Sequence, residues 1–145
     1  MAERVKSEEE LRRLSVEMRY LEQTADALQQ RINMVNAAIT DLTYANMTLD
    51  GIEKEKENAE LLVPIGGSSY VKVKLADTNK VIVGMGAGVS IEKTLVEAKA
   101  TLKERLDELE KTMTAAQQQF SQVAERINSG RGRLENLLAA REGKQ

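Results

Sequence analysis

The stretch LRRLSVEMRYLEQTADALQQRINMVNAAITDLTYANMTL, residues 11–49, repeats two apolar positions in every seven. One row of the repeat consists of Leu14, Leu21, Leu28, Val35, Leu42 and Leu49. The companion row consists of Leu11, Met18, Ala25, Ile32 and Ile39, followed by the polar Asn46. A heptad pattern sustained over this length predicts a coiled-coil helix, which we place from about Ser7 to Glu57. A single polar seam residue such as Asn46 costs stability and favours one register.

A second heptad stretch closes the chain. One of its rows consists of Leu95, Leu102, Leu109, Ala116, Val123, Gly130 and Leu137, and the other of Leu106, Met113, Phe120, Ile127 and Leu134. Thr94 and Glu97 have the spacing of a capping box, so we predict a helix from Thr94 to about Arg141. Two helices of similar length predict an antiparallel coiled coil. One register fills its layers, pairing Leu14 with Leu134, Leu21 with Ile127, Leu28 with Phe120, Val35 with Met113 and Leu42 with Leu106.

The segment between the helices has the period of strands. Residues 61–65, 70–75, 80–85 and 89–93 are apolar or alternate apolar with polar, and Gly66-Gly67-Ser68 and Gly86-Ala87-Gly88 separate them as turns. This pattern predicts two successive β-hairpins, with Pro64 at an edge or a bulge because it lacks an N–H. We therefore divide the single structural domain 1–145 into an N-terminal helix (1–58), a hairpin region (59–93) and a C-terminal helix (94–145).

The hairpins need a cover that two coiled-coil helices do not offer. A short isolated hairpin is marginally stable in water and has unpaired edges. The helix seams are occupied by each other, so we expect the cover to come largely from other subunits. The residues that need it are Val71, Val73, Leu75, Val81, Val83 and Met85. The sequence thus predicts an obligate oligomer with a shared sheet or barrel, from which the coiled coils project.

The far ends of the two helices are rich in leucine. Leu134, Leu137 and Leu138 lie opposite Leu11, Leu14 and Val16. Gly130 and Gly132 each cost a helix about 1 kcal/mol relative to alanine, so this end should bend or fray more easily than the rest. Two interpretations stay open: a compliant apolar clamp for segments of other proteins, or the ordinary frayed end of a coiled coil.

Composition excludes several classes of function. The chain has no Cys and no His, and its paired carboxylates lie on charged helix faces, so we expect no enzyme, no metal site and no cofactor. A net charge of −2 without basic clusters argues against nucleic acid. The charged N-terminus is unlike a signal peptide and no apolar run is long enough to cross a bilayer, so we expect a cytoplasmic protein without a membrane partner. The glycines of GMGAG (84–88) miss the spacing of a dinucleotide fingerprint and fit a hairpin turn.

Two motifs in the hairpin region resemble the alpha class of the prefoldin family. They are LVPIGGSSYVK (62–72) and VIVGMGAGVSIE (81–92). Two hairpins are similar to the alpha class, whereas a beta-class subunit would have one. The resemblance implies an archaeal source and a mainly α fold: a long antiparallel two-helix coiled coil whose hairpin strands join an oligomeric β-barrel body.

The resemblance also implies a function and the residues that perform it. It implies a heterohexamer of two alpha and four beta subunits whose tips hold non-native client proteins without ATP and deliver them to a group II chaperonin. The residues implied at the client-binding tip are Leu11, Leu14, Met18, Leu134, Leu137 and Leu138. Those implied in subunit assembly are Val63, Ile65, Val71, Val73, Leu75, Val81 and Val83.

Two other functions share parts of this pattern. A gamma-type prefoldin relative would polymerise into a structural filament through the same strand edges. A nucleotide-exchange cochaperone also combines long helices with a β domain, but there the β domain follows the helices, whereas here it lies between them.

Overall fold

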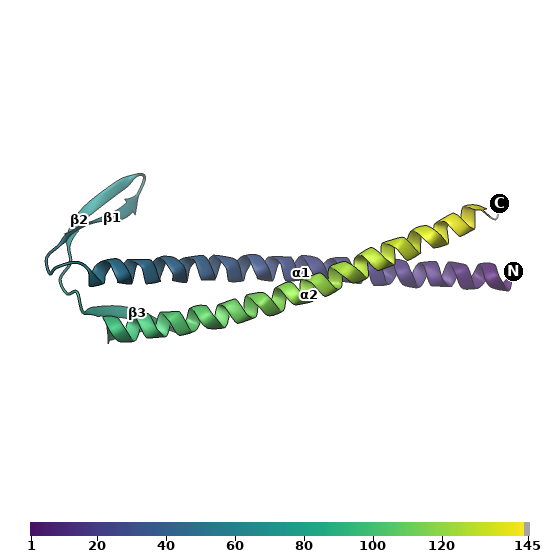
Figure 1. Cartoon of the computed structure of the whole chain (residues 1–145). Helices are drawn as coiled ribbons and strands as arrows, with labels where there is room; N and C mark the ends of the chain where they lie inside the picture. Colours follow the sequence, from purple (N-terminus) through teal and green to yellow (C-terminus); the bar gives the residue numbers. More distant parts are fainter. Residues whose placement is uncertain (144–145) are drawn as a thin grey trace. The chain divides into compact units, whose positions relative to one another are not determined.

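The computed structural model describes residues 1–143, so the last two residues of the predicted C-terminal segment lie outside the described residues. Two long helices, α1 (Ala2–Glu53) and α2 (Leu95–Gly143), flank four strands. The strands are β1 (Glu60–Gly66), β2 (Ser69–Lys74), β3 (Lys80–Gly86) and β4 (Val89–Thr94) (Figure 1). The predicted fold class is therefore confirmed.

The helix boundaries differ from the prediction by a few residues. Helix α1 starts five residues before Ser7 and ends at Glu53 rather than Glu57. The amides of Lys54 and Glu55 donate to carbonyls three residues earlier, which tightens the end of the helix. Asn58 then takes a positive φ of 65° and turns the chain toward β1. Residues 53–57, which alternate glutamate and lysine, form the end of α1 and the turn after it, because none of them is an apolar seam residue.

The hairpins are two antiparallel two-stranded sheets, β1–β2 and β3–β4. Both have a two-residue turn whose central residues take positive φ, Gly67 and Ser68 in the first and Ala87 and Gly88 in the second. Both ladders shift register just before the turn, after Pro64 and after Gly84, so the predicted bulge at Pro64 is present. Each pair of the first ladder has a counterpart twenty residues later, from Glu60↔Lys74 and Lys80↔Thr94 onward. The hairpin region is thus an internal structural repeat.

The chain forms two compact units, and each helix contributes to both. Unit 1 consists of Met1–Ala37 and Lys111–Gln145, and unit 2 of Ala38–Glu110. Within the described part of the chain, neither helix is long and apolar enough to cross a membrane.

The core of unit 1 is the coiled-coil seam. Leu14, Met18 and Leu21 are buried, and Val123, Ile127, Leu134 and Leu137 of α2 pack against them. Met18 also lies directly against Gly130. This contact fits the predicted register, because Met18 follows Leu14 by four residues and Gly130 precedes Leu134 by four.

The core of unit 2 joins a hairpin to the helix ends. Leu49, Val83, Leu95 and Ala98 are buried together, with Ile52, Val81 and Leu102 around them. The amide of Leu95 donates to the carbonyl of Asn79 at 2.8 Å, which ties the start of α2 to the start of β3. The amide of Glu97 donates to Thr94 Oγ1 at 3.2 Å, as the predicted N-cap requires.

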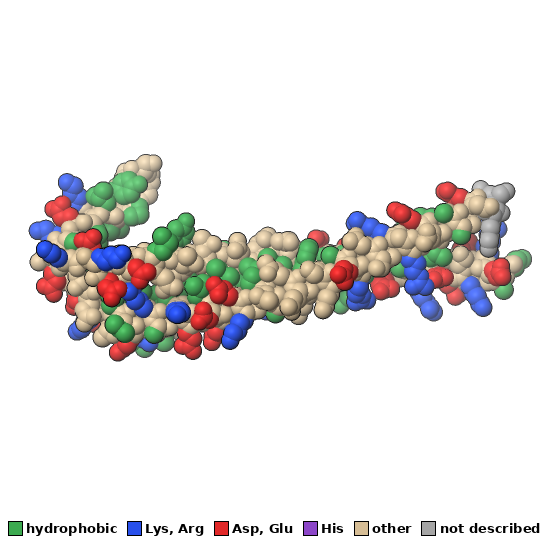
Figure 2. Space-filling model, viewed as in Figure 1, with side chains coloured by type: hydrophobic (Ala, Val, Ile, Leu, Met, Phe, Trp, Pro, Cys, Tyr) green, Lys and Arg blue, Asp and Glu red, His purple; other side chains and the backbone are tan. Residues whose placement is uncertain are grey.

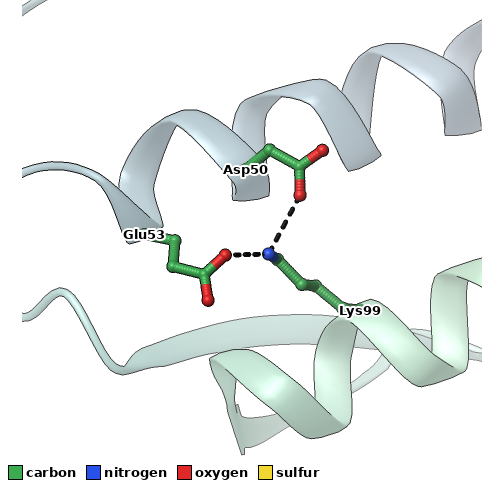
Figure 3. Close-up of polar contacts among 3 residues, drawn as sticks. All are labelled: Asp50, Glu53 and Lys99. Atoms are coloured by element: carbon green, nitrogen blue, oxygen red, sulfur yellow. Dashed lines mark hydrogen bonds and ion pairs between the residues drawn. The ribbon is translucent and has the colours of Figure 1, made fainter.

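An ion-pair cluster closes unit 2 beside this core. The Lys99 ammonium lies between Asp50 and Glu53 of α1, 2.9 Å from Asp50 Oδ1 and hydrogen-bonded to Glu53 Oε2 (Figure 3). The last turn of α1 carries no basic residue, so its two carboxylates lie unfavourably near the negative end of the helix dipole. The hydrogen bond to Glu53, followed by the one to Asp50, raises the pKa of Lys99 above its ordinary value. Lys99 thereby offsets the unfavourable charge at the end of α1.

The expectation that other subunits cover the hairpin residues does not hold for Val83 and Val81. Val83 is only 5% exposed and Val81 is half-buried, because both pack against helix residues of the same chain. In unit 2, apolar residues in the last turn of α1 and the first turns of α2 pack against β3. Other subunits are therefore not needed to cover Val81 and Val83.

Candidate functional site

We call the end of the unit 1 coiled coil at which α1 begins and α2 ends the tip. A groove of about 300 Å³ lies there between the first turns of α1 and the last turns of α2. Its lining residues are Met1, Glu3, Arg4, Ser7, Glu8, Leu11, Leu137, Ala140 and Arg141. Apolar side chains from both helices thus meet in a solvent-open groove with a charged rim.

The six client-binding candidates fall into three environments. Leu14 and Met18 are buried in the seam at 7% exposure, and Leu134 packs on them half-buried. Leu11 and Leu137 are half-buried and line the groove. Leu138 is 43% exposed. In this closed arrangement, the candidates that another protein can reach are Leu138 and the groove leucines.

The apolar surface near the tip also includes Met1, Val5 and Tyr20, which were not predicted from the sequence, and Val16, which was. Met1 and Val5 are exposed, and Val16 and Tyr20 line a second, shallow groove on the outer side of α1. None of these four residues belongs to a seam row, so the heptad pattern carried no signal for them. A count of apolar residues at the outward positions of the repeat would have found Val5 and Tyr20.

The tip is bordered by ion pairs of one polarity. In the four pairs that join the helices within the described part of unit 1, α1 provides the glutamate and α2 the arginine. The pairs are Glu10–Arg133 (2.6 Å), Glu17–Arg126 (3.3 Å), Glu22–Arg131 (3.9 Å) and Glu8–Arg141 (3.9 Å). Acidic and basic side chains accordingly flank the coiled coil near the tip (Figure 2). All eight side chains are largely exposed, so each pair contributes on the order of 0.5 kcal/mol.

The β1–β2 hairpin exposes apolar side chains on both faces. Residues paired across the ladder share a face, so Val63 and Val71 lie on one face and Pro64 and Tyr70 on the other. Val63, Ile65 and Val71 are exposed, while Val73 and Leu75 are half-buried. Leu62 and Tyr70, which sequence reasoning did not select, are more than 60% exposed. Figure 2 shows hydrophobic side chains over this hairpin.

The β3–β4 hairpin exposes the face that points away from its own helices. Ile82 is 76% exposed, in contrast to its buried neighbour Val83. Ile91 pairs with Val83 and shares its face, yet it is exposed, as are Met85 and Val89 beside the turn, so the face toward the helices is only partly covered. Both sheets have only two strands, so each strand has one unpaired edge. The hairpins therefore offer apolar faces and free strand edges, which are the elements of a shared sheet.

Comparison with known proteins places these features in context. The family model of the prefoldin subunit matches residues 21–138. The prefoldin subunit alpha of Methanococcoides burtonii is 33% identical, with 85% of this chain and 89% of the relative covered. That of Methanosarcina barkeri is 38% identical over 74% of this chain and 76% of the relative. These relatives come from archaea, the source that the resemblance implied.

Two solved structures share the fold. Filamentous PFD from Methanocaldococcus jannaschii superposes with a TM-score of 0.66 at 23% identity, covering 77% of this chain and 92% of that chain. The prefoldin beta subunit of a Thermococcus strain gives a TM-score of 0.59 at 17% identity, covering 88% and 90%.

Proposed function

Because the chain belongs to the prefoldin family of chaperone subunits, we propose that it is an alpha-type subunit that holds non-native polypeptides at its coiled-coil tip without ATP. The observation that carries this proposal is the solvent-open groove at the tip, where Leu11 and Leu137 lie beside the exposed Leu138. An unfolded chain exposes apolar side chains that a folded surface does not, so an open apolar groove favours unfolded partners.

The tip has the character of a surface that accepts many sequences. The large apolar residues that line its groove are Met1, Leu11 and Leu137, and flexible side chains such as methionine adapt to different partners. The groove rim contains both Arg4 and Arg141 as well as Glu3 and Glu8, so it favours neither charge in a partner. Holding by apolar contact alone needs no nucleotide and no catalytic group.

The hairpin faces support an assembly with beta-type subunits. Prefoldin subunits form oligomers with beta-type partners, and we propose the arrangement of two alpha and four beta subunits for this chain. In it, Val63, Ile65, Val71, Val73 and Leu75 would meet other subunits, while Val81 and Val83 would act indirectly by holding β3–β4 on its helices. Under this proposal, residues 1–58 and 94–145 hold the client, and residues 59–93 make the contacts between subunits.

Two further steps complete the proposal. The held client is passed to a group II chaperonin, and the whole cycle takes place in the cytoplasm. Support for both steps is the chain's membership of the family.

The proposal is tested by light scattering of a denatured, aggregating protein in the presence of the complex with beta-type subunits from the same organism. The double variant Leu137→Ser/Leu138→Ser removes apolar surface from the tip. The matched control Met34→Ser removes an exposed apolar side chain of α1 outside the tip. We expect the tip variant to suppress aggregation less well and the control to match the wild type. Equal suppression by all three complexes would move the client site away from this tip.

A filament-forming protein is the second candidate. Its support is the similarity of fold to filamentous PFD and the free strand edges of both hairpins. Electron microscopy of the purified chain alone separates the two candidates. The chaperone proposal predicts no long filaments, whereas regular filaments formed without beta-type subunits would favour the structural role.

A further inference from the structure

The contact between Met18 and Gly130 is the most unusual packing feature of the tip. Gly130 occupies a seam position, where the other members of its row are leucine, valine or alanine. A Cβ added at Gly130 would overlap the Met18 sulfur and lie 3.4 Å from Met18 Cε. Gly130 therefore provides the space that the Met18 thioether fills. Gly132, two residues later, has no atom within 4 Å of an added Cβ, so it makes no comparable contact.

The Met18 side chain covers residues that the proposed function needs. Met18 and Leu14 are both 7% exposed and belong to one buried cluster with Leu134 and Leu137. A solvent-open pocket of about 340 Å³ lies beside this cluster. Leu14 and Gly130 line it together with the polar residues Glu17, Glu125, Arg126, Ser129 and Arg133. Its rim includes Glu17 and Arg126, which form an ion pair that is open to solvent and contributes little to keeping the helices closed. The buried cluster around Leu14 and Met18 thus lies next to a solvent-open pocket.

Methionine is suited to moving in and out of such a position. Its unbranched side chain has three rotatable bonds, so it can leave the seam without a shift of either helix backbone. The atoms that an added Cβ would displace are the sulfur and the terminal methyl, which are the free end of that side chain. A residue at position 130 larger than glycine would accordingly expel Met18 rather than unfold the helices.

We propose that Met18, seated against Gly130, is a movable side chain that closes the seam at the tip, and that its departure opens the seam around Leu14 to a client. This inference rests on the proposed function, since it assigns control of the same tip. The occupant of the space that Met18 leaves in the seam is an apolar side chain of a non-native polypeptide, which packs against Leu14 in place of Met18. Met18 then acts as a positioning residue that sets how much of the seam a client can reach.

The test compares Gly130→Ala with its matched control Gly132→Ala. Both changes replace glycine by alanine in the same helical segment, so both favour the helix, but only the first takes the space of Met18. The first readout is the rate at which hydrogen peroxide oxidises Met18 in the assembled complex, followed by mass spectrometry. Oxidation follows exposure, and the exposed Met34 is the internal reference. We expect Met18 to react several-fold faster in Gly130→Ala than in the wild type, and at the wild-type rate in Gly132→Ala.

The second readout is suppression of client aggregation by the same complexes. We expect Gly130→Ala to suppress better than the wild type and Gly132→Ala to match the wild type. Unchanged oxidation of Met18 in Gly130→Ala would overturn the inference whatever the clients do. Faster oxidation without a change in suppression would also overturn it, provided that Leu137→Ser/Leu138→Ser still weakens suppression. If that tip variant has no effect either, the proposed function itself fails.

Discussion

Glycines in this chain have three different roles, and their substitution separates them. Gly86 takes a φ of 98° at the bulge before the β3–β4 turn, a conformation that residues with a Cβ rarely adopt. Gly84 lies two residues earlier in the same strand with ordinary φ and open space around an added Cβ. Gly130 has ordinary helical φ but a close neighbour. Backbone conformation, rather than crowding, therefore decides the outcome in the hairpin.

The first prediction concerns Gly86. Gly86→Ala should lower the free energy of unfolding by about 1–2 kcal/mol, because alanine is forced into a positive φ. Gly84→Ala should be neutral or raise it by up to about 0.5 kcal/mol, because it only restricts the unfolded chain. Thermal unfolding of the two variants measures this difference. A loss of stability at both positions would show that space, not φ, is limiting.

The second prediction concerns Lys99. Its pKa is raised above the ordinary value of 10.5 by Glu53 and Asp50, so its stabilising contribution is fully present below that value and is lost as pH rises through the raised pKa. Lys99→Met should therefore be less stable than the wild type at about pH 8, and the gap should narrow at strongly alkaline pH. Thermal unfolding of both proteins across this range measures the gap. A gap that does not change with pH would mean that Lys99 acts through packing alone.

At the scale of elements, the heptads predicted both helices and the layer that pairs Met18 with Gly130. They could not predict what Gly130 does: a glycine in a seam row looks like a weak point until the partner that fills its space is known. The strand pattern likewise predicted both hairpins. Alternation tells which residues share a face of a hairpin, but not which surface covers that face. Val83 and Val63 hold equivalent positions in the two hairpins, yet only Val83 is buried by its own helices.

The third prediction concerns the polarity of the tip ion pairs. Arg133→Glu places a glutamate beside Glu10 and should destabilise the complex by about 1 kcal/mol. The double exchange Glu10→Arg/Arg133→Glu restores opposite charges and should recover most of this loss. Thermal unfolding at low and high salt measures both effects, and the difference should shrink at high salt because exposed charges are screened. A double exchange no better than the single one would show that the two side chains do not interact in solution.

At the scale of the whole molecule, the exposed face of β1–β2 marks where this chain is incomplete. Val63 and Val71 are both more than 40% exposed on one face, and a two-stranded hairpin has little stability of its own. On the counterpart face of β3–β4, Val83 is buried by its own helices while Ile91 stays exposed. The chain therefore covers part of one of these two faces itself, and we expect another subunit to cover the face of β1–β2.

The fourth prediction follows from this incomplete cover. Val71→Asp places a charge on the exposed face and should reduce assembly with beta-type subunits, since burying an unpaired carboxylate costs several kcal/mol. Val16→Asp on the outer side of α1 is the control and should assemble normally. Size-exclusion chromatography of each mixture measures assembly. Normal assembly of Val71→Asp would place the subunit contact elsewhere on the hairpins.

The central claim is that the tip of this chain touches non-native protein, and site-specific photo-crosslinking tests it most directly. A photoreactive residue is placed at Leu138 in the tip or at Met34, which is even more exposed but lies outside it. Each assembled complex is mixed with a chemically denatured protein and illuminated. We expect strong crosslinks to the denatured protein from position 138, weak ones from position 34, and none from either to the same protein once folded. Crosslinks from position 34 but not from position 138 would contradict the central claim.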